Sequence, residues 1–165
     1  MVRLADKQET LPVFLEPEDA LACFFNSLFG HTRNWPRAYS CLAPAARERF
    51  GAERGILMFA DYWDDKLSFL EELVKARHGE YAYTHRTCFS LDSIRQERLS
   101  ADAAVFAVEL VEKHVARDRL MIVQRKKLSR HGQGWLLANG ELEGSLDDII
   151  KVKSPGARPL FRDPT

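Results

Sequence analysis

The sequence lacks the long apolar runs that mark membrane proteins. No run of apolar residues approaches the ~20 that a membrane-spanning helix needs. Asp6, Lys7 and Glu9 interrupt the start of the chain, whereas a secretory signal peptide needs an apolar region of roughly 7–15 residues. We therefore expect a cytoplasmic protein that makes no membrane contact.

An excess of charge of one sign is also missing. The 24 Lys and Arg residues balance the 24 Asp and Glu residues, so the formal net charge is zero. A dedicated nucleic-acid binder usually carries a clear basic excess. We expect no nucleic-acid partner.

Cysteine is scarce, and the histidines are scattered. Cys23, Cys41 and Cys88 are odd in number, far apart in the sequence and form no C-x-x-C pair, which favours buried free thiols over a disulfide framework. The five histidines show no ligand spacing, and neither a G-x-G-x-x-G motif nor a P-loop is present. We expect no metal and no cofactor.

What the chain does have is enough apolar material for one core. Its 165 residues are 45% apolar and 29% charged, which fits a single globular domain and not a disordered chain. We expect one domain over 1–165, with its core at about 17–144 and flexible ends at 1–14 and 153–165.

The sequence pattern of the first half predicts helices. Pro17 followed by Glu18 and Asp19 suits a helix start, and Gly30 suits its end. Asn34 is typical of the N-cap of a second helix. A short turn follows Pro44, and a stripe of period 3.6 predicts helix over 53–79.

The stripe over 53–79 fits one long helix or two shorter ones. Ser68 and Glu71 have the spacing of a capping box, in which each side chain satisfies a backbone N–H of the other residue. An acidic cluster at Asp61, Asp64 and Asp65 precedes them. These features favour two helices with a bend near 64–68.

After residue 79 the period changes to two, which is typical of strands. The alternation predicts strands over 81–87, 103–115, 120–128 and 134–142, joined as antiparallel hairpins by short loops. The alternation slips near Leu110 and Val111, which predicts a β-bulge there. A helical turn is expected within 145–152. Helices followed by an antiparallel meander predict an α+β domain with its helices packed on one sheet face.

The alternation also divides the sheet residues between two faces. We expect Phe24, Phe25, Trp63, Phe106 and Trp135 to be buried, because each lies on an apolar stripe. The inner face would carry Phe106, Val108, Leu110, Leu120 and Ile122, and the outer face Val105, Ala107, Val111, Met121 and Val123. An outer face with this many apolar residues predicts a homodimer through the sheet. Alternatively, the tail at 145–165 folds back and covers this face within one chain.

Three stretches resemble the nuclear-transport-factor-2-like superfamily. The run at 34–47, NWPRAYSCLAPAAR, is similar to that superfamily's [D/N]-W-x-x-A-Y-x-x-L-x-P-x-x-R stretch. The segment 59–63 fits the helix that follows there, and 127–138 resembles the last two strands, where a Gly-containing turn precedes a Trp, here Trp135. The resemblance covers roughly 17–144.

This resemblance implies a cone-shaped domain, in which a strongly curved sheet wraps the helices, a pocket opens in the mouth of the cone, and the chain forms a dimer. The superfamily includes steroid isomerases, SnoaL-type polyketide cyclases, dehydratases, epoxide hydrolases, transport adaptors and accessory domains without catalysis. None of its catalytic patterns carries over residue by residue. The function must therefore be argued from the site.

The candidate site residues lie on the expected first strand and on the helices. His85 is a candidate base and Tyr83 a hydrogen-bond donor on one strand face, although such a face is more often solvated or part of a dimer contact. Asp61, four residues before Asp65 on a helix, is a second catalytic candidate; exposed carboxylates at this spacing are common. The predicted ligand pocket consists of Tyr39, Tyr62, Trp63, Tyr83, His85, Phe106 and Trp135.

A basic stretch at 125–131, together with Arg117, Arg119, Lys151 and Lys153, could bind an anionic partner. Four acids, Glu141, Glu143, Asp147 and Asp148, are expected nearby, which favours a solvated hairpin.

Three functions follow as hypotheses. The first is a domain that binds a small apolar molecule or serves as an accessory domain. The second is an isomerase, dehydratase or cyclase that acts on an apolar carbonyl compound. The third is a protein-interaction adaptor that uses the sheet face.

Overall fold

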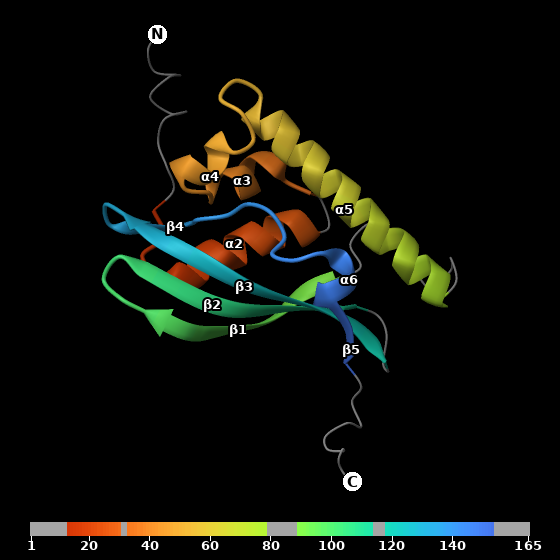
Figure 1. The fold of residues 1–165 in the computed structure, drawn as a ribbon. Coiled ribbons are helices and arrows are strands. Elements are labelled where there is room, and N and C mark those ends of the chain that lie inside the picture. The colour runs from red at the N-terminus through yellow and green to blue at the C-terminus, as the bar shows by residue number, and fades with distance from the viewer. Residues whose placement is uncertain (1–12, 31–32, 79–88, 114–117, 154–165) are drawn as a thin grey trace.

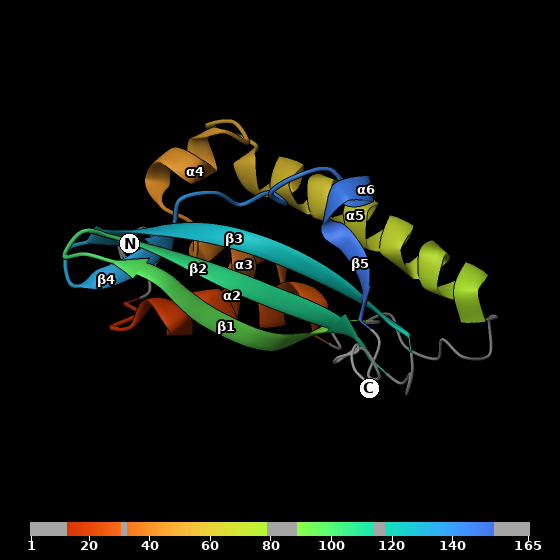
Figure 2. The ribbon, with the colours of Figure 1, turned by 60° about the horizontal axis from the view of Figure 1, so that its bottom comes forward.

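The computed structural model describes residues 13–30, 33–78, 89–113 and 118–153, and the structural statements below concern these residues. A helical half precedes a five-stranded antiparallel sheet whose outermost strands do not pair to close a barrel. The helices lie on one side of the sheet (Figure 1), and Figure 2 shows the opposite side without any labelled element across β1–β3. The predicted α+β class is therefore confirmed. The predicted strand over 81–87, with Tyr83 and His85, lies outside the described residues.

The first helices begin where the sequence predicts. Helix α2 (Pro17–Phe29) has Pro at its first position and two acids in its first turn, which favour a helix N-terminus. Helix α3 (Trp35–Ser40) is capped by Asn34, whose side chain accepts a hydrogen bond from the Arg37 N–H at 3.1 Å. Helix α4 (Pro44–Glu48) again begins with Pro. All three starts follow from local backbone chemistry.

Helix α5 (Gly55–His78) is one continuous helix, so the expected bend near 64–68 is wrong. Arg33 explains the continuity, because its side chain contacts both Asp64 and Glu71, which lie two turns apart on one face of α5. Glu71 therefore pairs with Arg33 and does not complete a capping box with Ser68. The predicted break falls between two residues that Arg33 ties together.

The sheet follows the order β1-β2-β3-β4, with β5 paired to the other end of β3. Its strands are β1 (Phe89–Leu99), β2 (Ala103–Glu112), β3 (Arg119–His131), β4 (Gly134–Leu137) and β5 (Ile150–Lys153). The short helix α6 (Leu146–Ile149) precedes β5, so the expected helical turn over 145–152 is followed by a strand. The expected strand over 134–142 ends at Leu137, and the chain then leaves the sheet.

Strand β1 was not predicted, and the bulge was expected on the wrong strand. The register between β1 and β2 shifts between Leu91 and Ser93 and again between Gln96 and Arg98, while β2 pairs with β3 in continuous register. Both irregularities therefore lie on β1, one of them opposite the residues where we expected a bulge on β2. Extra residues in a strand interrupt its alternation, which conceals β1 from a search for period two.

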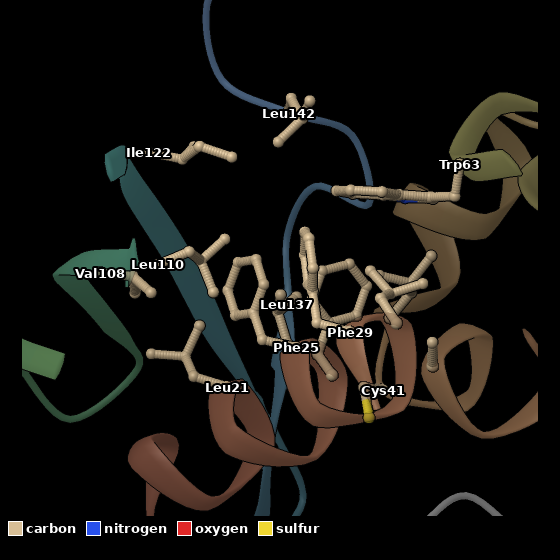
Figure 3. Close-up of a cluster of buried hydrophobic side chains, with 14 of the residues drawn as sticks. Leu21, Phe25, Phe29, Cys41, Trp63, Val108, Leu110, Ile122, Leu137 and Leu142 are labelled. Carbon is tan, nitrogen blue, oxygen red and sulfur yellow. The ribbon is translucent and has the colours of Figure 1, made fainter. Parts of the chain in front are cut away.

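The five aromatic side chains predicted to be buried are all buried: Phe24, Phe25, Trp63 and Phe106 at 0% exposure and Trp135 at 4%. Figure 3 shows part of this core, where rings from α2 and α5 meet aliphatic side chains of the sheet. Trp63 packs edge-on against Phe24 and Phe29, with ring centroids 6.0 and 6.3 Å apart. The inner face of the sheet carries its predicted residues Phe106, Val108, Leu110, Leu120 and Ile122, all buried.

Within the described residues, no helix is both long and apolar enough to cross a membrane.

Candidate functional site

The described members of the predicted ligand pocket lie in or against the hydrophobic core. Trp63, Phe106 and Trp135 are buried, and Tyr39 and Tyr62 are half-buried against them. The Trp63 indole Nε1–H donates to the Gly140 carbonyl at 2.6 Å, and the Tyr62 hydroxyl accepts the Leu142 N–H at 3.0 Å. None of these five side chains lines the three surface concavities described below. Their role in a ligand pocket stays a prediction.

Asp61 and His85 are the two catalytic candidates. Asp61 is exposed to solvent on α5, where nothing in the described structure supplies the apolar surroundings that tune an acid or base. His85 lies outside the described residues. Among these residues, no group of three or more His, Cys, Asp or Glu side chains is arranged to hold a metal ion.

The inner face of the sheet holds a fully buried cation, Lys126. Its ammonium donates to the carbonyl oxygens of Asn139 (3.3 Å) and Glu141 and lies 3.4 Å from the Glu143 carboxylate. It also lies 5.8 Å from the centre of the Phe24 ring. Burial lowers the pKa of Lys126 to about 8, while the charge of Glu143 acts in the opposite direction.

Lys126 fixes the chain that follows β4, here named the closing segment, residues 138–143. Three N–H donors of one ammonium meet three acceptors on this segment. Gln124, one inward position along β3, both donates to the Glu143 carbonyl and accepts its N–H, at 3.1 and 2.8 Å. With every donor used, Lys126 is arranged to hold the closing segment over the inner face and not to attack a substrate.

The sequence contained a signal for this cluster. Leu120, Ile122 and Leu128 point inward, and side chains alternate along a strand, so residues 124 and 126 had to point inward as well. We expected the whole basic run at 125–131 to be solvated. The alternation of the strand instead turns Lys126 inward and its two basic neighbours outward. Arg125 and Lys127 point outward and are exposed.

The outer face of β1–β3 carries fewer exposed apolar side chains than the sequence suggested. Val105, Met121 and Val123 are half-exposed, but Ala107 and Val111 are already buried within one chain, at 8% and 1% exposure. Five apolar residues were expected to need a cover. Three of them remain available for a contact.

Cations surround this apolar strip. Two concavities of about 350 and 460 Å³ share Arg98, Val105 and Lys127 as lining residues, and the larger one also includes Glu97 and Arg125. We call this surface the basic groove, defined by Glu97, Arg98, Val105, Arg125 and Lys127.

One acid lies within the basic groove. Glu97 accepts hydrogen bonds from Arg125 Nε and a second guanidinium nitrogen, at 2.7 and 3.2 Å, and lies 3.4 Å from Arg95. The hydrogen bonds from Arg125 lower the pKa of Glu97, so its carboxylate stays ionised and fixes the Arg125 guanidinium. Arg98 and Lys127 form no side-chain hydrogen bond or ion pair within the described residues, which leaves two cations free to bind an anion.

The positive charge continues along the face. The register of β3 with β5 places Arg119 and Lys151 on the same side of the sheet as Met121. Among the side chains that the structure describes, this face therefore carries six cations against three acids, even when Asp92 in the first bulge is counted with Glu97 and Glu109. The six cations are Arg95, Arg98, Arg119, Arg125, Lys127 and Lys151. Two of the four acids expected to weaken this field pair elsewhere: Glu141 lies 3.1 Å from Arg49 in the helical half, and Glu143 contacts the inward Lys126.

Comparisons with protein-family models, with curated proteins and with solved structures find no match for this chain.

Proposed function

We propose that this chain is a non-catalytic binding domain whose outer sheet face docks an acidic segment of a partner protein. The observation that carries the proposal is the basic groove, in which Arg98 and Lys127 flank the half-exposed Val105. An apolar side chain between two unpaired cations, on a strip that continues to Val123 and Met121, suits an extended peptide that alternates acidic and apolar residues. Main chain and side chains of such a peptide would lie along the strands.

Charge complementarity favours an acidic protein segment over two other anionic partners. No aromatic side chain stands at the outward positions of β1, β2 and β3, whereas single-stranded nucleic acids bind mainly by stacking bases on aromatic rings. These positions also lack the Trp, Phe and Leu side chains that insert into a membrane interface. An acidic peptide requires neither aromatic rings for stacking nor apolar side chains that insert into a membrane.

The fold proposed with this function is the cone of the nuclear-transport-factor-2-like superfamily. The order of helices before an antiparallel meander, with all helices on one side, supports this assignment. The pocket-based functions have less support, because the described residues predicted for the pocket pack in the core and Lys126 holds the closing segment over the inner face.

A labelled peptide tests the proposal. A fluorescein-labelled peptide of about 12 alternating Glu and Val residues would match the 13 residues of β3 in length. Exposed ion pairs contribute only about 0.2–1 kcal/mol each, so we expect weak binding that decreases as salt is raised from about 50 to 200 mM. Fluorescence anisotropy gives the affinity.

Two charge-reversal variants with the same change in net charge locate the site. Arg98→Glu with Lys127→Glu should weaken peptide binding at least about tenfold, the equivalent of about 1.4 kcal/mol. The control, Arg37→Glu with Arg54→Glu, changes exposed cations of the helical half and should leave the affinity within about twofold. Equal losses in both variants, or tighter binding of single-stranded DNA than of the peptide, would contradict the proposal.

A further inference from the structure

Cys23 and Cys41 come from different helices and meet in the fold. Cys23 lies in the middle of α2, and Cys41 is the C-cap residue of α3. The Asn34 N–H donates to the Ser27 carbonyl at 2.9 Å and fixes the point where α3 turns back across α2. Figure 3 places the Cys41 sulfur beside the α2 ribbon. Cys41 belongs to the buried core, and Cys23 packs against that core from α2.

The two thiols interact with each other. The pKa of the Cys41 thiol is raised first by burial and then by the Cys23 side chain, through its charge and through a hydrogen bond. Cys41 Sγ also donates to the Arg37 carbonyl at 3.4 Å. The Cys41 thiol is therefore held protonated beside Cys23.

Only one of the pair can be reached from solvent. A groove of about 440 Å³ runs along the face of α2 that carries Asp19, Cys23 and Asn26, and Asn34 and Arg37 form its other wall. Cys23 is half-exposed in this groove, while Cys41 is fully buried beneath it. The accessible thiol is the one that an oxidant would meet first.

We propose that Cys23 and Cys41 form an oxidisable pair, in which hydrogen peroxide reacts at Cys23 and Cys41 resolves the product to an intramolecular disulfide. In the first step the Cys23 thiolate attacks one peroxide oxygen; the O–O bond breaks, and the sulfenic acid and hydroxide form. In the second step Cys41 loses its proton and attacks the Cys23 sulfur; the S–S bond forms, and the S–O bond breaks as water leaves. Overall, two thiols are oxidised by two electrons, and one peroxide is reduced to two waters.

The disulfide would lock the helical layer to the sheet. The Cys41 carbonyl accepts the Leu137 N–H at 2.9 Å, and the Ala43 N–H donates to the Leu137 carbonyl at 2.8 Å. Cys41 thus lies where α3 meets β4. A bond from this point to α2 joins three elements, so the oxidised chain should melt at a higher temperature than the reduced one.

The experiment uses the full chain with Cys88→Ser, which removes the third thiol. After treatment with hydrogen peroxide, we expect the loss of both titratable thiols and a mass lower by about 2 Da in the monomer, both reversed by dithiothreitol. Peptide mapping should then find Cys23 linked to Cys41. Retention of both thiols, or a disulfide between two chains only, would overturn the proposal.

Two single variants in the same background separate the roles. With Cys41→Ala we expect oxidation to stop at the sulfenic acid of Cys23, which dimedone captures. With Cys23→Ser we expect Cys41 to react at least about tenfold more slowly, because it is buried. Equal rates of thiol loss in the two variants would overturn the assigned order. Circular dichroism tests whether each single variant is folded. If one of them is not, the oxidation of the Cys88→Ser chain alone decides the proposal.

Discussion

At the scale of single residues, Lys126 shows how a buried charge is accommodated. Removing an ammonium from water is costly, and here three oxygen acceptors and the face of Phe24 replace the lost hydration. The compensation is incomplete, since burial still lowers the pKa of Lys126 to about 8. A pH dependence of stability follows from this difference.

The first prediction concerns that pH dependence. The folded chain releases the Lys126 proton at about pH 8, whereas an unshifted lysine does so near 10.5. Between these values the unfolded chain binds more protons, so the contribution of Lys126 to the free energy of unfolding rises with pH. From pH 8 to 10.5, the free energy of unfolding measured with urea should rise for the natural chain relative to Lys126→Met, by on the order of 1–3 kcal/mol. Parallel curves would contradict the assigned pKa.

The second prediction concerns two neighbouring residues of β2. Phe106 is fully buried on the inner face, and Val105 is half-exposed on the outer face. Phe106→Ala should lower the free energy of unfolding by about 3–5 kcal/mol, because it removes buried apolar surface and leaves a cavity. Val105→Ala, the matched control, should lower it by less than about 1 kcal/mol. Similar losses would mean that the faces of β2 are wrongly assigned.

At the scale of elements, α5 depends on a contact from outside itself. The side chain of Arg33, only 6% exposed, bridges Asp64 and Glu71 across the point where the sequence favours a break. A local capping signal competes here with a tertiary ion pair, and the ion pair prevails. The continuity of α5 should therefore be sensitive to Arg33.

The third prediction tests this dependence. Arg33→Met should destabilise the chain by about 1–3 kcal/mol, because Glu71, at 20% exposure, loses its cation. Amide hydrogen exchange should accelerate over 64–71 and stay unchanged near Phe59. Lys66→Met, which removes a cation lying 4.0 Å from the exposed Asp65, serves as the control. Unchanged exchange over 64–71 would show that α5 is continuous without Arg33.

The elements also show what the sequence could and could not predict. The alternation along β2 and β3 correctly divides their residues between two faces, because these strands pair in continuous register. It fails for β1, where the first of two bulges places the inward Leu91 and Ile94 three positions apart. The pairing of Cys23 with Cys41 has no local signal, since it depends on how α3 packs on α2. Short-range periodicity is visible in a sequence, whereas irregular pairing and helix packing are not.

At the scale of the whole molecule, the charges are segregated although they sum to zero. The outer sheet face carries six cations against three acids, while exposed acids such as Asp61, Asp64 and Asp65 lie on α5 on the helical side. A net charge of zero therefore conceals a strongly basic face. A net charge of zero therefore does not exclude an anionic partner that binds this face.

The homodimer predicted from the sequence would use this same face. In a two-fold dimer each copy presents the same patch, so two faces with more cations than acids would oppose each other. Two like charges about 10 Å apart in water repel by roughly 0.4 kcal/mol, and at low salt several such pairs oppose the burial of the three half-exposed apolar side chains. Salt screens the repulsion but not the apolar contact.

The last prediction follows from this balance. At low salt we expect sedimentation equilibrium to give the monomer mass, and any self-association to strengthen between about 50 and 500 mM salt. Val123→Glu should abolish that association, because it introduces a charge into the apolar strip, whereas Asp61→Lys on the far side should not. A chain with twice the monomer mass at low salt, reduced to the monomer by Val123→Glu, would establish the homodimer. The sheet face would then be occupied by a second copy, and an acidic protein segment would have no access to the basic groove.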